Sequence, residues 1–151
     1  MGKLVTLVIA ALALGLAGLA VAATTGETYN YKATLTPGVE VPKPNAPAGA
    51  KGSFTATVVE KGATASISWK LTYSGLSGKA TGAHIHKGKA GVAGPVIVVL
   101  CGPCTSGKSG KGTIKASVAK ALETGRAYVN VHTTKNPGGE IRGQVKLAKK
   151  M

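Results

Sequence analysis

Apolar and polar residues alternate through most of this sequence, and the alternation predicts β-strands rather than helices. The clearest case is Ala65 to Ser74, where every second residue from Ile67 to Tyr73 is large and apolar and the residues between them are Ser, Lys or Thr. Trp69, the only tryptophan, is expected to be the main anchor of the core. The same reasoning predicts further strands at 28–35, 53–60, 83–88, 96–100, 113–118, 126–134 and 140–147.

Turn signals separate these strands. Prolines and glycines predict a loop over 36–47, a turn at Lys61-Gly62 and a hairpin loop over 136–139. Only 119–124 has the composition of a short helical turn, which Gly125 would end. About eight strands without a long helix predict an all-β fold, an antiparallel Greek-key or immunoglobulin-like β-sandwich or barrel. Its expected core includes Trp69, Leu71, Ile85, Val129 and Val131.

The first 22 residues have the layout of a helical secretory signal peptide. A short positive start that includes Lys3 precedes an apolar run from Leu4 to Leu19, and Ala20-Val21-Ala22 is a small-residue cleavage signal. The alternative is a retained membrane anchor, because Leu4 to Ala23 is just long enough to span a bilayer. The cleavage signal favours removal, which leaves one domain over 23–151 and no stable membrane span. We therefore expect a secreted, periplasmic or cell-envelope protein.

The charge is strongly positive. The chain has 19 Lys and Arg residues against 5 acidic ones, a net charge of +14, and it contains no aspartate. Loss of Lys3 with the signal peptide leaves 18 basic against 5 acidic residues, or +13. An exported protein of this charge is expected to meet polyanionic envelope polymers or anionic lipid, and the export signal argues against nucleic acid. The alternative is that the positive charge serves only solubility and nonspecific attraction to surfaces.

All three histidines lie on predicted strands with matching parity. His84 and His86 point the same way when Ile85 points into the core, and His132 points outward when Val129 and Val131 point inward. If the two strands are neighbours, three imidazoles converge outside the core and could hold copper or zinc. The alternative is that each histidine only hydrogen-bonds to loop backbone. Glu140 and Arg142 share a face of a predicted strand and are expected to form a surface ion pair. The alternative is that Glu140 orients one of the imidazoles.

Cys101-Gly102-Pro103-Cys104 has the sequence of a thioredoxin active site. That chemistry needs a helix after the first cysteine, and the Gly/Ser/Lys-rich segment that follows cannot form one. In an exported protein, a local disulfide between Cys101 and Cys104 is the better interpretation. The sequence also has no Gly-x-Ser-x-Gly elbow and no paired carboxylates, so hydrolase chemistry has no support. A non-catalytic binding or structural module is thus favoured over an enzyme.

Five stretches follow one another along the chain: Leu35-Thr36-Pro37-Gly38-Val39-Glu40-Val41-Pro42, Leu71-Thr72-Tyr73-Ser74-Gly75-Leu76, Ala83-His84-Ile85-His86 with Gly88 and Gly94-Pro95-Val96, Tyr128-Val129-Asn130-Val131-His132-Thr133, and Pro137-Gly138-Gly139-Glu140-Ile141-Arg142-Gly143-Gln144. Together they resemble the CHRD domain, named after chordin. The resemblance covers nearly the whole mature chain in the order of the family. It implies an immunoglobulin-like β-barrel and an exported location, and it implies no activity, since the family has no agreed biochemical function.

Four features also follow in order: the His-x-His strand, a glycine-rich loop with Ala93-Gly94-Pro95, a Val-x-Val-His strand and a late Gly-x-x-Arg-Gly segment. Their order resembles, more weakly, that of copper/zinc superoxide dismutase. This likeness implies that His84, His86 and His132 match copper ligands and that Arg142 matches an arginine that guides the substrate. The likeness fails at the bridging histidine, because Val96 stands at that place, and no aspartate is present to complete a zinc site. It therefore implies a copper- or zinc-binding alternative, with dismutase activity in doubt.

Overall fold

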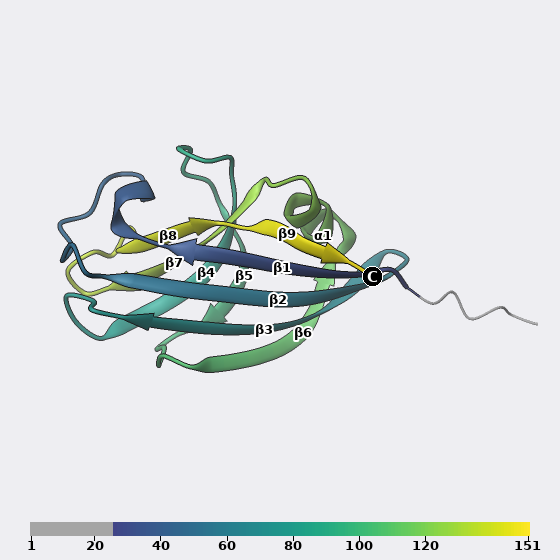
Figure 1. Ribbon diagram of the computed structural model, residues 1–151, viewed down its shortest axis with the longest axis horizontal. Helices are drawn as coiled ribbons and strands as arrows, with labels where there is room; N and C mark the ends of the chain where they lie inside the picture. Colours follow the sequence, from purple (N-terminus) through teal and green to yellow (C-terminus); the bar gives the residue numbers. More distant parts are fainter. Residues whose placement is uncertain (1–25) are drawn as a thin grey trace, which may run out of the picture.

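The computed structural model describes residues 26–151, which form two antiparallel β-sheets packed on each other (Figure 1). The order of strands is β6-β3-β2-β1-β9 in the five-stranded sheet and β5-β4-β7-β8 in the four-stranded sheet. This architecture confirms the predicted all-β sandwich. The elements of the described range are β1 (Thr28–Leu35), η1 (Pro37–Val39), β2 (Lys51–Lys61), β3 (Thr64–Ser74), β4 (Ala80–Lys87), β5 (Val96–Cys101), β6 (Lys108–Lys115), α1 (Ala116–Glu123), β7 (Ala127–Thr133), β8 (Ile141–Gln144) and β9 (Lys146–Lys150).

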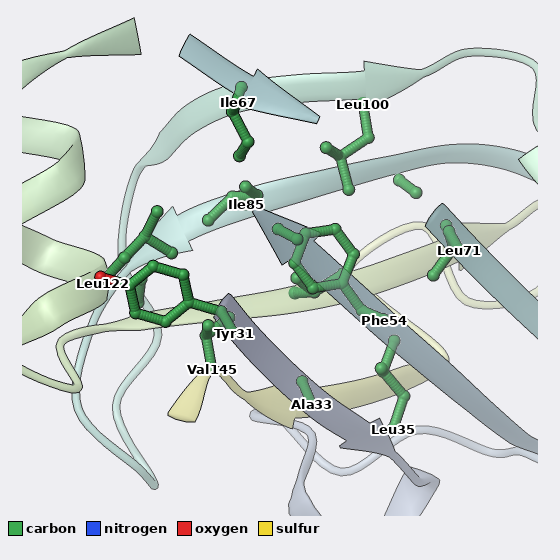
Figure 2. Packing of buried hydrophobic residues seen from close by; sticks show 14 of the residues in the cluster. Tyr31, Ala33, Leu35, Phe54, Ile67, Leu71, Ile85, Leu100, Leu122 and Val145 are labelled. Carbon is green, nitrogen blue, oxygen red and sulfur yellow. The ribbon is translucent and has the colours of Figure 1, made fainter. Parts of the chain in front are cut away.

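The core fills the space between the sheets, because alternate residues of each strand point into it. Figure 2 shows Phe54, Leu71 and Ile85 meeting there. The predicted core positions Leu71, Ile85, Val129 and Val131 are all fully buried. Burial of these side chains supplies the main driving force that holds the two sheets together.

The predicted role of Trp69 is wrong. Phe54 of β2 is fully buried, whereas Trp69 is only partly buried and packs against the edge of the core. Trp69 lies where β6 passes β3, and its ring occupies the space above Gly110, which has no side chain. The indole therefore covers one side of the sandwich, and the phenyl ring of Phe54 fills its centre.

Several predicted boundaries also change, most of all in two segments. The single strand expected over 140–147 is two strands, β8 and β9, which belong to different sheets. Val145 between them is fully buried, and the chain crosses from one sheet to the other there. The strand expected at 113–118 begins earlier, at Lys108, because the Gly/Ser/Lys-rich segment pairs with β3. This strand ends at Lys115 and helix α1 begins at Ala116, so the helix is longer than the short turn expected over 119–124.

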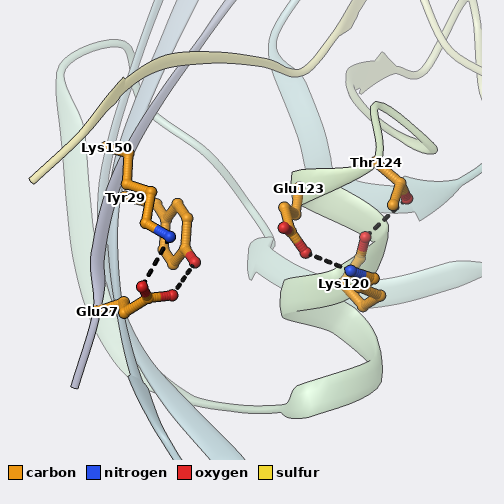
Figure 3. A network of polar contacts seen from close by, with 6 residues as sticks. All are labelled: Glu27, Tyr29, Lys120, Glu123, Thr124 and Lys150. Carbon is orange, nitrogen blue, oxygen red and sulfur yellow. Dashed lines mark hydrogen bonds and ion pairs between the residues drawn. The ribbon is translucent and has the colours of Figure 1, made fainter.

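The two ends of the described chain are joined by pairing of β1 with β9. Figure 3 shows the carboxylate of Glu27 accepting a hydrogen bond from the Tyr29 hydroxyl and pairing with Lys150 at 2.7 Å. The predicted signal peptide and its cleavage site lie outside the described residues. Within residues 26–151, no helix is long and apolar enough to cross a membrane.

Candidate metal centre

The three histidines meet on the outer face of the four-stranded sheet. His84 and His86 lie on β4, His132 lies on β7, and these strands are hydrogen-bonded neighbours. Since Ile85 and Val131 are fully buried on the inner face, strand parity directs the imidazoles outward. One ring nitrogen from each histidine lies within 4.8 Å of the other two. The sequence predicted this convergence on the condition that the strands are neighbours, and they are.

His86 is held with one nitrogen free. Its Nδ1 lies 2.8 Å from the carbonyl oxygen of Gly94, an acceptor, so Nδ1 carries the proton. Its Nε2 therefore carries a lone pair, and this atom is buried without a hydrogen-bond partner. The His86 side chain is only 9% exposed. A buried ring nitrogen with an unused lone pair is the state that a metal ligand requires.

His132 is fixed in the same way from the hairpin loop. Its Nδ1 lies 2.9 Å from the carbonyl oxygen of Pro137, so its Nε2 also carries a lone pair. That Nε2 lies 2.9 Å from Nδ1 of His84. Without a metal, His84 must donate its Nδ1 proton to His132. With the proton on Nε2 of His84 instead, the lone pairs of the three histidines would lie on Nδ1 of His84 and on Nε2 of His86 and His132.

Two of the imidazoles, His84 and His132, are disposed to stay uncharged. Burial lowers the pKa of His84 from its usual range, and the nearby charges of His132 and His86 lower this pKa further. Burial also lowers the pKa of His132, although the hydrogen bond to the Pro137 carbonyl acts in the opposite direction. Neutral imidazoles at neutral pH leave the lone pairs available to a cation.

Tyr128 and Arg142 support His86 from the side. The Tyr128 ring stacks on the His86 ring, with centroids 4.9 Å apart and planes 13° apart. The Arg142 guanidinium lies 3.4 Å from the Tyr128 ring centroid. Its Nη2 donates to the carbonyl oxygens of Lys89 and Val92, each at 2.9 Å. Arg142 thus ties down the loop between β4 and β5, whose Gly94 carbonyl orients His86.

Glu140 and Arg142 do not form the expected surface ion pair. Both side chains are buried, and within the described chain they make no ion pair with each other. The Glu140 carboxylate accepts hydrogen bonds from Ser77, Thr133 and Asn136, and no imidazole is among these partners. Glu140 lies just before β8, and its carboxylate reaches Thr133, which has the inner-face parity of β7. Arg142 instead lies over the Tyr128 ring, and its guanidinium is covered by the loop after β4.

The two cysteines are bonded to each other in the structure. Cys101 ends β5, both residues are buried, and the chain continues into β6 without a helix. This arrangement lacks the helix N-terminus that lowers the thiol pKa in thioredoxin-like sites. The disulfide fastens the end of β5, which is an edge strand of the four-stranded sheet.

Sequence reasoning missed the groups that orient the histidines. Tyr128 stands on the same face as His132 by alternation, and this was a usable signal. The carbonyl oxygens of Gly94 and Pro137 gave no signal in the sequence, because every residue offers the same backbone acceptor. Their positions depend on how two loops fold over the sheet.

The donor set narrows what the centre can do. Three imidazole nitrogens suit copper or zinc, and three protein ligands leave a position open. No carboxylate is among the hydrogen-bond partners of the three histidines, and both sulfurs are in the disulfide.

A CHRD-domain model matches residues 31–145, and CHRD domains occur in extracellular or secreted proteins. No curated protein and no solved structure matches the chain.

Proposed function

The chain belongs to the CHRD family, and we propose that this member is an extracellular module that binds one copper ion through His84, His86 and His132. One observation carries the proposal: the three ligand nitrogens converge while backbone carbonyls fix the far nitrogens of His86 and His132. Histidines that served only to hold loops would not need to direct their remaining lone pairs at one another. Copper is favoured over zinc, because nitrogen ligands bind divalent copper more strongly.

Copper titration of the protein tests this proposal. We expect one equivalent to bind tightly, with nitrogen hyperfine structure in the electron paramagnetic resonance spectrum. The variants His84→Ala, His86→Ala and His132→Ala should each weaken binding by about 100-fold or more, since even residues behind the ligands matter by 10–100-fold. Thr81→Ala, an exposed change on β4, is the matched control and should bind as the parent does.

The decisive comparison is with the variant that lacks all three histidines. Circular dichroism establishes that each variant is folded before it is titrated. Equal stoichiometric uptake of copper by the parent and the triple variant would refute the proposal and leave the histidines as structural groups. Loss of uptake in the folded triple variant alone supports it.

Copper affinity should also depend on pH in a defined direction. The pKa values of His84 and His132 lie below their usual range, mainly because of burial, so both are neutral at pH 7. Protons then compete with copper only under acidic conditions, and affinity should be constant near neutrality and fall below about pH 6. Titrations in matched buffers from pH 5 to pH 8 measure this dependence. An affinity that changes equally across the whole range would contradict a neutral-imidazole site.

Copper binding does not require catalysis. Val96 pairs with His86 across β4 and β5 and cannot supply the bridging ligand that the dismutase likeness would need. We therefore place binding ahead of dismutase-like activity. A dismutase assay on the copper-loaded parent, read above the background of free copper, separates the two roles.

A further inference from the structure

A second surface, on the opposite sheet, gathers lysines that are scattered in the sequence. Strand register aligns two neighbouring rows of outward positions across the five-stranded sheet. We call them together the lysine platform. Five of its ten positions are lysines, all exposed. In the order β9-β1-β2-β3-β6, the rows are Lys149, Asn30, Thr57, Ser68 and Lys111, followed by Lys146, Lys32, Thr55, Lys70 and Ser109.

No glutamate offsets this charge on the platform. Glu40 and Glu140 are buried beside the four-stranded sheet, and Glu123 is in α1. Glu60 pairs with the buried Ala65 and so has the parity of the inner face. Glu27 is already paired with Lys150. As the chain has no aspartate, all of its acidic side chains lie off the platform.

One lysine pair on the platform works against stability. Lys32 of β1 and Lys146 of β9 are direct cross-strand partners. Like charges directly opposite each other on neighbouring strands are destabilising. An anion seated between the two would remove this repulsion, so the pair itself points to an anionic ligand.

The surface between the lysines is slightly hollow and carries hydroxyl groups. A shallow depression of about 410 Å³ is lined by Lys32 and Lys70 of the middle strands, by Thr55, Thr57 and Ser68, and by residues of the opposite parity that include Tyr31 and Trp69. The Thr57 hydroxyl donates to Oδ1 of Asn30 at 2.7 Å, which leaves the Asn30 amide hydrogens free to donate elsewhere. Positive charges interspersed with hydroxyl and amide groups match a ligand that carries both acidic groups and hydroxyls.

We propose that the lysine platform binds an extended acidic polysaccharide. Strands lie about 4.8 Å apart, so Lys32 and Lys70 are separated by about 10 Å across the sheet. Successive acidic groups of one polymer can therefore contact different lysines, and each further contact is made at high effective concentration. The hydroxyls of the depression bind the sugar hydroxyls between the charges.

The same surface is a poor match for other polyanions. Insertion into lipid needs exposed apolar side chains, and the large ones in the described chain lie off the platform, for example Val99 on β5 and Leu147 opposite the buried Tyr31. Single-stranded nucleic acid binds through aromatic stacking, and no aromatic residue is among the ten platform positions. The two aromatic residues that line the depression belong to the core side, where Tyr31 is buried and Trp69 packs partly buried against the core. An acidic polysaccharide is the class that needs only charges and hydrogen-bond donors.

Binding of the full protein to polygalacturonate, measured by isothermal titration at low and high salt, tests the proposal. The platform variant Lys32→Gln/Lys70→Gln/Lys146→Gln should weaken binding by about tenfold or more, because it removes three charges from one contact surface. The matched control Lys43→Gln/Lys79→Gln/Lys135→Gln loses the same charge at exposed positions elsewhere, and we expect less than about twofold change.

The possible results separate the explanations. Equal weakening in both variants would mean that only net charge matters and would overturn the platform. Binding to neutral dextran as strong as to polygalacturonate would overturn it too, as would tighter binding to anionic phospholipid vesicles or to single-stranded DNA. Copper loading should leave polygalacturonate binding unchanged, because the histidines lie on the other sheet. Failure of this proposal therefore does not affect the copper proposal.

Discussion

At the scale of single residues, Glu140 is a buried acidic side chain that depends on hydrogen bonds from its neighbours. Its side chain is fully buried, and its two carboxylate oxygens accept hydrogen bonds from the turn before β4, from β7 and from the hairpin loop. We expect Glu140→Gln to lower the free energy of unfolding by about 2–4 kcal/mol, because charge-assisted hydrogen bonds are lost. Urea denaturation measures this. Glu123→Gln, at an exposed ion pair in α1, is the control and should cost less than about 1 kcal/mol.

The contribution of Glu140 should disappear in acid. Burial alone would raise the pKa of Glu140, but hydrogen bonds from Ser77, Thr133 and Asn136 outweigh it and hold this pKa below the usual 4.5. A carboxylate with a lowered pKa stabilises the fold above its unfolded-state value and loses that effect as pH falls through the folded-state value. The difference between the parent and Glu140→Gln should therefore shrink below about pH 4.5. A difference that is constant from pH 7 to pH 3 would contradict this.

Strand parity alone predicted the face of every histidine, because a period of two needs no knowledge of neighbours. Parity also gave the correct face for Trp69, which it shares with the buried Ile67 and Leu71, but the size of the residue wrongly suggested a central position. The absence of a side chain at Gly110 on a neighbouring strand, which periodicity cannot reveal, gave the indole its place at the edge. Strand parity also could not predict that Arg142 is only 1% exposed, because loops rather than the sheet itself bury this side chain.

At the scale of elements, the two sheets come into direct backbone contact where β8 passes β1. Thr36 and Arg142 form a bridge there, and a Cβ atom at Gly143 would overlap the backbone carbonyl of Thr34. We expect Gly143→Ala to destabilise the protein by about 1–3 kcal/mol, because the backbone must move to relieve the overlap. Thermal unfolding followed by circular dichroism measures the effect.

Gly112→Ala is the matched control for this change. Gly112 also lies in a strand, β6, and nothing lies within 4 Å of where its Cβ would be. Alanine there should be neutral or slightly stabilising, since glycine weakens a strand interior. Equal losses at the two positions would show that the contact with Thr34 is not what restricts Gly143.

Most strands could be predicted, but the division of the last one could not. Residues 140–147 alternate without interruption, so the sequence indicates a single strand. The structure divides it at Val145, because the chain leaves one sheet for the other and buries this side chain on the way. A change of sheet alters the hydrogen-bond partners of the backbone and leaves the side-chain period intact.

At the scale of the whole molecule, the sequence predicted a sandwich but not its strand order. Neither the pairing of β4 with β7 nor the register that gathers the platform lysines is encoded in local patterns. Both depend on contacts between residues far apart in the chain. These two arrangements create the candidate copper centre and the lysine platform, which lie on opposite sheets.

The pairing of β1 with β9 has a mechanical consequence. The two strands are antiparallel (Figure 1). Tyr29, near the start of β1, pairs with Lys150 at the end of β9. Tension applied to Gly26 and Met151 would pull in the unzipping geometry and would break the hydrogen bonds between the two strands one after another. Tension applied to Gly38 and Met151 would load those bonds together in shear, so single-molecule pulling should detach β9 at a clearly lower force in the first geometry.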